Sequence, residues 1–365
     1  MKVIQISNFF ADFRGSFINQ LELLADNIKK SGGECTFIFP NQAKELSWCI
    51  DLKMRHKIYF ISGINWRTRN LVNKELTNIF NIVKPDVIHS HFDGYDVSIT
   101  ISAAKDVQKI YHRHNEFDLS NLPLFKKIYA LLIINYKMLY LRNKGYSIFI
   151  SNEMCNNFIN KGYIIKKKAV VVFNGISTKT FENVKVTKQR FDKPVIFSLI
   201  GNWHTKGGDI ILEAVKFINR KEDKVILACI ISEEKLQEIR NSNQILPSWI
   251  IPLSSTNNIA KYFSFANIFI SASRKETFSY TLAEAIYFGL PCITSDISGV
   301  QWAKELKSIR FFESENIKAL ANEIEYLLKN KVEPNWLLQD KIIIKDKFSD
   351  DVWCKNILSF YSKII

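Results

Sequence analysis

The sequence predicts an α/β protein built from two doubly wound, Rossmann-like domains, and three observations carry this prediction. The chain has 365 residues, which exceeds the size at which a single hydrophobic core usually keeps growing. Its beginning reads strand, helix, strand, the order that builds a parallel sheet. The same alternation starts afresh with an apolar strand at Val195 to Ile200.

Composition indicates a globular protein. The chain is 47% hydrophobic and 24% charged, which is typical of a folded domain. No apolar run reaches the roughly 18 residues that a membrane-spanning helix needs. The first residues read as a core strand and lack the features of a secretory signal, so we expect a cytoplasmic location. The six cysteines are scattered, and we expect buried, reduced thiols.

The first domain opens with a strand at Lys2 to Ser7 and a loop that contains Gly15 and Ser16. An amphipathic helix follows at about Phe17 to Lys30, and then a strand at Cys35 to Pro40. The loop has no Gly-x-Gly-x-x-Gly, which counts against a dinucleotide cofactor. The next stretch, Trp48 to Trp66, has no clear period and reads as less regular.

Histidines mark the ends of two further strands of this domain. A helix at Arg69 to Val83 leads into a strand that ends in His89 and His91, and a short strand at Lys109 runs through His112 to His114. Such strand ends line the crevice of a parallel sheet. A single histidine is more often a hydrogen-bonded structural residue, and no His-x-x-x-His spacing accompanies these four. We therefore expect no metal.

The second domain begins with the strand at Val195 and the loop Gly201 to Gly208, ahead of a helix at about Asp209 to Phe217. A lysine at a helix amino terminus is repelled by the positive end of the helix dipole. The position of Lys206 is therefore better explained if an anion such as a diphosphate lies between the lysine and the helix. Such an anion would accept hydrogen bonds from the free backbone N–H groups of the helix. The alternative is a surface lysine that points away.

The stretch Ser271 to Gly299 carries the strongest functional signal. It reads strand, loop, helix, strand, with Glu276 in the loop and Glu284 on the helix, so that both carboxylates can address one ligand at a strand's carboxyl end. Two plainer interpretations stay open. Thr281 and Glu284 match a capping box, and a loop glutamate such as Glu276 is usually just solvated.

This stretch resembles the donor-site motif of glycosyltransferase family 4. The pattern is carried by Ser273, Glu276, Phe278, Glu284, Ala285, Gly289 and Pro291. Four further features resemble the same family: the strand that follows Lys84-Pro85-Asp86, the residue His114, the domain boundary at Asn174-Gly175, and the loop with Gly201 and Lys206-Gly207. The resemblance implies the GT-B fold, in which two Rossmann-like domains face each other across a cleft. The expected domains are 1–173 for the acceptor, 174–345 for the donor and a helix 346–365 that crosses back.

The resemblance also implies roles. Catalytic positions would be Glu276, His114 and Lys206; donor-binding positions would be Glu284, Asn202, Thr277, Phe278, Ser279, Tyr280, Thr281 and Gly201. Gly15 and Ser16 would contact the acceptor. The donor would be a UDP- or GDP-sugar, with retention of anomeric configuration and no cofactor or metal. The family's usual arginine after the first glycine is Asn202 here, and the loop is one residue shorter. His204 and Arg274 are candidates for the missing positive charge.

The formal charge of +14 is compatible with other partners. Residues 101–170 hold twelve Lys or Arg against four acids. Their aromatic helix near Ile128 to Leu141 can lie on an anionic membrane or pack into a core. A nucleic-acid-binding protein is a weaker alternative, since no recognised motif accompanies the charge. A sugar-nucleotide epimerase on the same fold and a glycoside hydrolase with paired carboxylates are the remaining alternatives. The expected acceptor is a glycan or a lipid-linked intermediate in surface polysaccharide biosynthesis.

Overall fold

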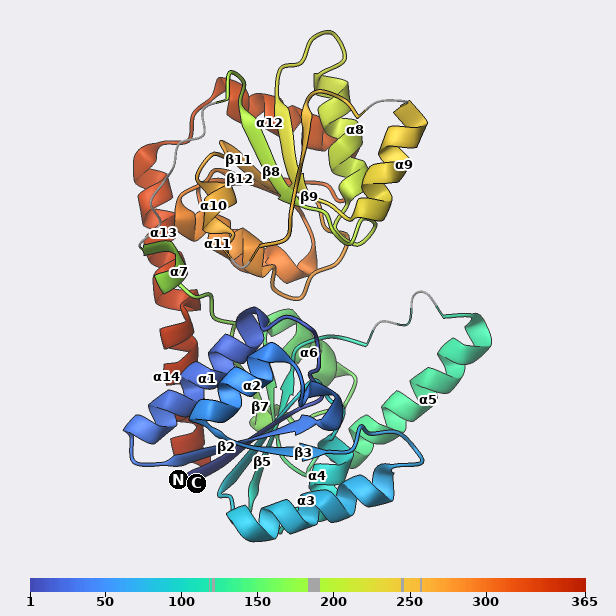
Figure 1. The fold of residues 1–365 in the computed structure, drawn as a ribbon, viewed down its shortest axis with the longest axis vertical. Helices are drawn as coiled ribbons and strands as arrows, with labels where there is room; N and C mark the ends of the chain where they lie inside the picture. The colour runs from blue at the N-terminus through green and yellow to red at the C-terminus, as the bar shows by residue number, and fades with distance from the viewer. Residues whose placement is uncertain (118, 120–121, 183–190, 244–245, 257) are drawn as a thin grey trace. The chain divides into compact units, whose positions relative to one another are not determined.

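A computed structural model describes residues 1–117, 119, 122–182, 191–243, 246–256 and 258–365. The chain divides into two compact units (Figure 1). Unit 1 consists of Met1–Gly175 together with Asp350–Ile365, and unit 2 of Ile176–Ser349. Each unit has its own parallel sheet with helices around it, so the predicted fold of two Rossmann-like domains is confirmed.

Unit 1 contains a sheet of seven parallel strands in the order β3-β2-β1-β4-β5-β6-β7. Its strands are β1 Lys2–Ser7, β2 Glu34–Pro40, β3 Lys57–Ile61, β4 Val87–His91, β5 Gln108–Arg113, β6 Tyr146–Phe149 and β7 Ala169–Val171. The central strands are buried on both faces, which is why they read as apolar runs.

The helices of unit 1 cover both faces of this sheet. They are α1 Gly15–Lys30, α2 Ser47–Arg55, α3 Arg69–Val83, α4 Asp96–Ser102, α5 Leu124–Leu141, α6 Asn152–Asn160 and α14 Asp350–Ile364, with short 3-10 turns at Asn41–Ala43 and Lys166–Lys168. The apolar side of α14 carries Trp353, Ile357 and Tyr361, which pack in one core with Val3 and Val87. The end of the chain therefore belongs to unit 1.

Unit 2 contains a sheet of six parallel strands in the order β10-β9-β8-β11-β12-β13. Its strands are β8 Val195–Leu199, β9 Ile226–Ile230, β10 Ile250–Leu253, β11 Ile268–Ser271, β12 Cys292–Ser295 and β13 Ile309–Phe312. Its helices are α7 Lys179–Glu182, α8 Gly208–Ile218, α9 Glu233–Asn243, α10 Ala260–Phe263, α11 Tyr280–Phe288, α12 Ile317–Lys329 and α13 Pro334–Phe348, with a 3-10 turn at Ser298–Ala303.

Two features differ from the sequence expectation. The stretch 48–66 contains α2 and the edge strand β3, whose residues are only partly buried and so lack a strong apolar period. The helix α13 was also missed, because few of its side chains are buried. Within the described residues, no helix is long and apolar enough to cross a membrane.

Candidate functional site

The strand order of unit 2 brings two loops together. From β8 the chain runs through α8 to β9 on one side, whereas β11 pairs with β8 on the other. The loops that follow β8 and β11 therefore leave the sheet side by side at the point where the strand order reverses. Open α/β sheets bind ligands at such a point. Residues 200–207 and 272–279 form these two loops.

Close packing fixes the two loops to each other. The backbone N–H of Arg274 donates to the carbonyl of Thr205 at 2.9 Å. Gly207 has a φ of +65°, and a Cβ there would come within 2.0 Å of the carbonyl oxygen of Ala272. Only glycine satisfies both the left-handed backbone and this approach. Gly299 plays a similar part, because a Cβ there would meet the carbonyl of Glu276 at 2.1 Å.

Arg274 clamps the loops but is not a free cation. Its Nη1 donates to the carbonyl of His204 at 2.6 Å, and its two terminal nitrogens hold Asp209 at 2.9 and 2.6 Å. Its Nε donates to Glu315 at 2.8 Å. The hydrogen bonds to Asp209 and Glu315 raise the pKa of Arg274 further. With two carboxylates around the guanidinium, Arg274 is poorly suited to supply the second positive charge that the sequence left open.

Lys206 and Glu276 form an ion pair between the loops. The Nζ of Lys206 lies 2.5 Å from Oε1 of Glu276, and the hydroxyl of Ser273 donates to the same oxygen at 2.9 Å. Glu276 is largely shielded, at 13% side-chain exposure, whereas Lys206 is 37% exposed. Glu276 thus supplies the negative charge that the sequence reasoning expected from a bound anion. A phosphate that reached Lys206 would compete with this carboxylate.

The loop after β11 ends at the amino terminus of α11. Ser279 precedes the helix with a φ of 61°, and no side chain caps the helix. Phe278 is buried and stacks on Trp302, whose Nε1 donates to the Phe278 carbonyl at 2.7 Å. The side chain of Phe278 therefore contributes to packing. Only the backbone of Phe278 is left for its predicted contact with the donor.

Glu284 is the carboxylate without a partner. The helix begins at Tyr280, so Thr281 lies inside it and the capping box does not form. Glu284 is half-buried on the first turns of α11, and no hydrogen bond or ion pair joins its carboxylate to any other residue that the structure describes. Burial raises the pKa of Glu284 to about 7. A desolvated carboxylate that lacks a partner is costly, and it marks a site where a ligand can donate hydrogen bonds.

The remaining predicted residues of unit 2 lie on the same two loops or at the start of α11. Gly201 lies in open space, where an added Cβ would meet no atom within 4 Å. Asn202 is exposed; its carbonyl accepts from the Lys206 N–H at 2.8 Å, and its side chain lies 3.4 Å from the Thr205 nitrogen. Thr277 and Thr281 are partly buried. Of the predicted donor-binding residues of unit 2, Gly201, Asn202 and Thr277 to Ser279 lie on the two paired loops, and Tyr280, Thr281 and Glu284 lie on the first turns of α11.

In unit 1, His114 belongs to a buried group that we call the histidine cluster, made of His89, His91, His112 and His114. The parallel register places His91 opposite His112, and alternation along each strand puts all four rings on one face. Neighbouring rings of the cluster are 4.2 to 5.3 Å apart. His114 is 9% exposed and packs against Phe17 and Phe92.

Gln5 on β1 organises the hydrogen bonds of the cluster. Its Nε2 donates to the Tyr361 hydroxyl at 2.9 Å, and that hydroxyl lies 2.5 Å from Nδ1 of His89. On its other side, the Oε1 of Gln5 lies 2.8 Å from Nε2 of His91, whose Nδ1 lies 3.0 Å from Nε2 of His114. Since Oε1 can only accept, His91 donates to Gln5 and His114 donates to His91. His114 then presents the lone pair of Nδ1.

The same cluster is the one place in the described residues where three histidines could hold a metal. The ligand atoms of His89, His91 and His112 lie within 4.8 Å of one another. However, Nε2 of His89 already lies 3.2 Å from Nδ1 of His112, and burial holds the pKa of His89 and of His114 near 3. The contacts are those of a neutral, hydrogen-bonded chain, in which Nε2 of His112 is buried without a hydrogen-bond partner among the described residues.

Gly15 and Ser16 lie at the first turn of α1, where Gly15 has a φ of 59°. Nothing else among the described residues around them marks a site. Sequence reasoning missed Gln5, Tyr361 and Trp302. No motif or spacing identifies these residues, because their contacts join segments as far as 356 positions apart in the sequence.

Comparisons with known proteins agree with the fold of two Rossmann-like domains. Residues 180–343 match the family model described as glycosyl transferases group 1. No curated protein matches the sequence. Among solved structures, a glycosyltransferase from Rickettsia africae ESF-5 superposes with a TM-score of 0.81 at 18% identity, covering 100% of this chain and 98% of that one.

Two further structures are similar over their whole length. Anabaena HepE in complex with UDP and glucose has a TM-score of 0.78 at 14% identity, with 99% of each chain covered. The lipopolysaccharide outer core galactosyltransferase WaaB has a TM-score of 0.72 at 18% identity, with 100% of each chain covered. Residues 180–343 are therefore similar to the glycosyl transferases of group 1, and the chain as a whole has the GT-B fold.

Proposed function

We propose that this protein transfers a sugar from a UDP- or GDP-sugar to a glycan or lipid-linked acceptor, with retention of anomeric configuration, in surface polysaccharide biosynthesis. The observation that carries the proposal is Glu284. Its half-buried carboxylate has no partner among the described residues and has a raised pKa. The two hydroxyls of a ribose would donate to it and favour its charged form.

The other residues of unit 2 suit a diphosphate leaving group. In the transfer, the bond between the anomeric carbon and the phosphate oxygen breaks and a bond to the acceptor oxygen forms. The acceptor proton leaves with the diphosphate. Negative charge grows on the diphosphate, where Lys206 and the uncapped amino terminus of α11 would stabilise it without a metal ion. Glycoside hydrolysis produces no such leaving group, so the paired-carboxylate alternative is disfavoured.

Glu276 would then have two partners in turn. With no donor bound it neutralises Lys206. When a diphosphate takes up Lys206, the carboxylate is released to accept from a hydroxyl of the donor sugar. Gly201, Asn202 and the backbone of Thr277 to Thr281 would hold the phosphates and the sugar. For His114 we propose contact with the donor through its Nδ1, and for Gly15 and Ser16 contact with the acceptor.

Donor binding can be tested directly. UDP or GDP should raise the thermal unfolding temperature of the wild type, and Glu284→Ala and Lys206→Ala should remove this protection. Glu213→Ala is the matched control, since Glu213 lies on α8, outside both loops, and pairs with Lys216. A screen of sugar nucleotides for slow hydrolysis would then identify the donor. Turnover to an epimer without any acceptor would instead favour the epimerase alternative.

Peripheral contact with an anionic membrane belongs to the same proposal, because a lipid-linked acceptor lies at a membrane surface. The support for it is the uncovered surface of α5. The same contact would place the enzyme on the inner face of the membrane.

A further inference from the structure

The helix α5 leaves most of its apolar side chains exposed. Among its eighteen residues, only Met138 and Leu141 are buried. The first part of the helix, residues 124–129, is exposed at every position. In Figure 1 this part extends outward from the sheet of unit 1. The exposed large apolar side chains of α5 are Leu124, Phe125, Ile128, Tyr129, Leu131, Leu132, Ile133, Tyr136, Leu139 and Tyr140.

These apolar side chains lie together on one helix, whereas the exposed apolar side chains of an ordinary protein surface are scattered singly. Phe125 is 83% exposed, Tyr136 77% and Leu124 75%. Contiguous exposed apolar patches of this kind mark interaction sites. Aromatic rings such as Tyr129 and Tyr136 combine an apolar body with a polar hydroxyl, which suits the boundary between lipid tails and headgroups.

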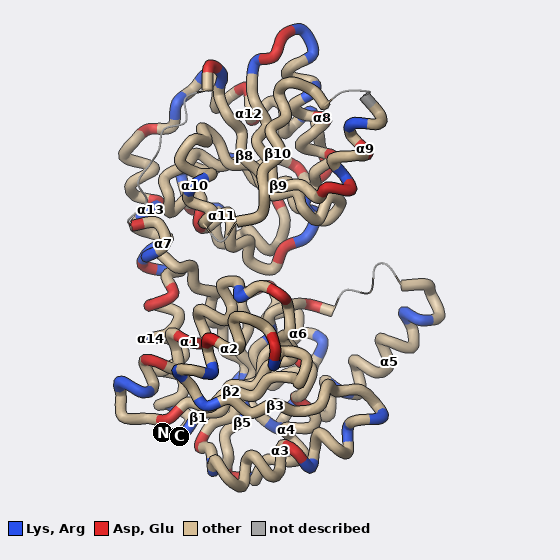
Figure 2. Tube along the Cα trace, viewed as in Figure 1, with Lys and Arg blue, Asp and Glu red and all other residues tan. Residues whose placement is uncertain are grey.

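Charge distinguishes an anionic bilayer from a second copy of the chain as the occupant. Residues 119–152 contain five basic residues and no acidic one, and Figure 2 shows basic positions but no acidic ones along α5. Two copies that met through this helix would bring like charges together, with no carboxylate on the segment to neutralise them. An anionic lipid surface supplies the missing negative charge.

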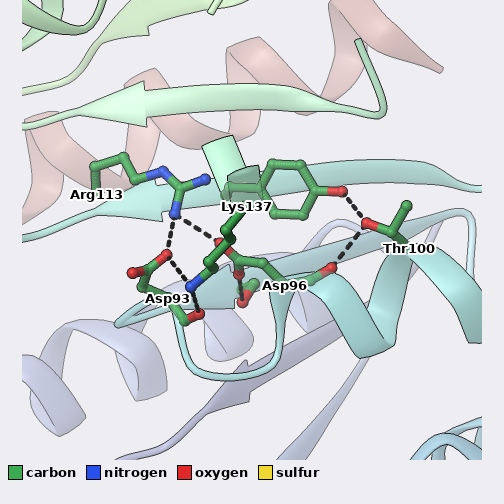
Figure 3. A network of polar contacts seen from close by, with 7 residues as sticks. Asp93, Asp96, Thr100, Arg113 and Lys137 are labelled. Carbon is green, nitrogen blue, oxygen red and sulfur yellow. Dashed lines mark hydrogen bonds and ion pairs between the residues drawn. The ribbon is translucent and has the colours of Figure 1, made fainter. Parts of the chain in front are cut away.

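The basic residues of α5 do not all serve the same purpose. Lys137 lies at the base of the helix, where its Nζ donates to the Asp93 carbonyl at 2.7 Å and pairs with Asp93 Oδ1 at 2.9 Å (Figure 3). Arg113 holds Asp93 and Asp96 from the sheet side, which anchors this end of α5 to the core of unit 1. Lys126 and Lys127, by contrast, are exposed beside Phe125.

We infer that the amino-terminal turns of α5 insert into the headgroup region of an anionic bilayer, with Leu124 and Phe125 entering the apolar boundary and Lys126 and Lys127 contacting acidic headgroups. Lys137 is a structural anchor and does not contact lipid. The inference deepens the membrane contact of the proposed function. Because lipid binding needs no sugar donor, the two can fail separately.

The test is flotation of the full chain with vesicles of phosphatidylcholine, with and without about a third of phosphatidylglycerol. We expect binding to the anionic vesicles only, weakened at high salt. Replacing both lysines by glutamine should lower partitioning about 25-fold, because each contributes about fivefold. Leu124→Ser with Phe125→Ser should lower it at least about 100-fold, since two buried apolar side chains are lost.

Matched controls exist in the same unit. Lys166→Gln with Lys167→Gln changes the net charge equally at exposed positions, and Ile82→Ser removes an exposed apolar side chain of α3. These should bind vesicles as the wild type does, and all variants should keep thermal protection by UDP or GDP. Absence of vesicle binding by the wild type, or equal losses in the controls, would overturn the inference. So would dimers in sedimentation velocity that Leu124→Ser with Phe125→Ser abolishes.

Discussion

Replacing Glu284 by glutamine should stabilise the ligand-free protein above neutral pH while it weakens nucleotide binding. Burial raises the pKa of Glu284 from 4.5 to about 7. The folded state therefore binds the proton more tightly than the unfolded state, and the associated stability is present below pH 4.5 and lost as pH rises through 7. The difference of 2.5 pKa units corresponds to about 3 kcal/mol at pH 8.

Glutamine has the same shape as glutamate but no charge to desolvate. At pH 8 we expect Glu284→Gln to raise the unfolding temperature of unit 2 by about 6–12 °C, with only a small rise at pH 5, where the wild-type carboxyl is already mostly protonated. Scanning calorimetry at both pH values measures this. The control is Glu213→Gln on α8, whose side chain is 49% exposed; it should leave both temperatures unchanged.

Nucleotide binding should change in the opposite direction. A hydrogen bond to a charged group contributes about 1.5–3 kcal/mol, so Glu284→Gln should weaken UDP or GDP binding at least about tenfold in calorimetric titrations at pH 8. The reasoning would be refuted by a variant that is no more stable than wild type at pH 8. It would also be refuted if nucleotide affinity were unaffected, because Glu284 would then face neither a desolvating environment nor the ribose.

Three further predictions follow from the packing. Gly207→Ala should destabilise unit 2 by more than about 1 kcal/mol in urea unfolding, since its Cβ would meet the Ala272 carbonyl, whereas Gly201→Ala, with open space around it, should leave the unfolding midpoint unchanged. Arg274→Lys should cost about 1–2 kcal/mol, because lysine cannot hold Asp209 with two parallel bonds; equal midpoints would contradict the clamp. The histidine cluster should make the protein less stable in acid, because burial lowers the pKa of each of its four histidines. Below about pH 6.5 the unfolded state therefore binds more protons than the folded state, and the free energy of unfolding falls by up to about 5 kcal/mol per pH unit. His112→Asn should reduce this slope, measured as unfolding midpoints over a series of pH values.

The alternation of elements and the two glutamates could be predicted from local sequence. Strands such as Val195–Leu199 and Ile268–Ser271 are buried on both faces and therefore apolar throughout, which makes them recognisable. The edge strand Lys57–Ile61 could not be recognised, because its residues are mostly half-buried and carry no clear period. The last helix was expected within residues 346–365 and is observed at Asp350–Ile364.

The sequence by itself determined the two Rossmann-like domains, because backbone periodicity and turn residues are local properties, and it predicted a group of loop residues as donor-binding. Only the tertiary structure decided which of the charged residues there pair with one another. It paired Lys206 with Glu276, committed Arg274 to Asp209 and Glu315, and left Glu284 without a partner among the described residues. It also left the apolar side of α5 uncovered, although its pattern suits a core equally well. These outcomes depend on which distant segments come together, and local sequence carries no record of that.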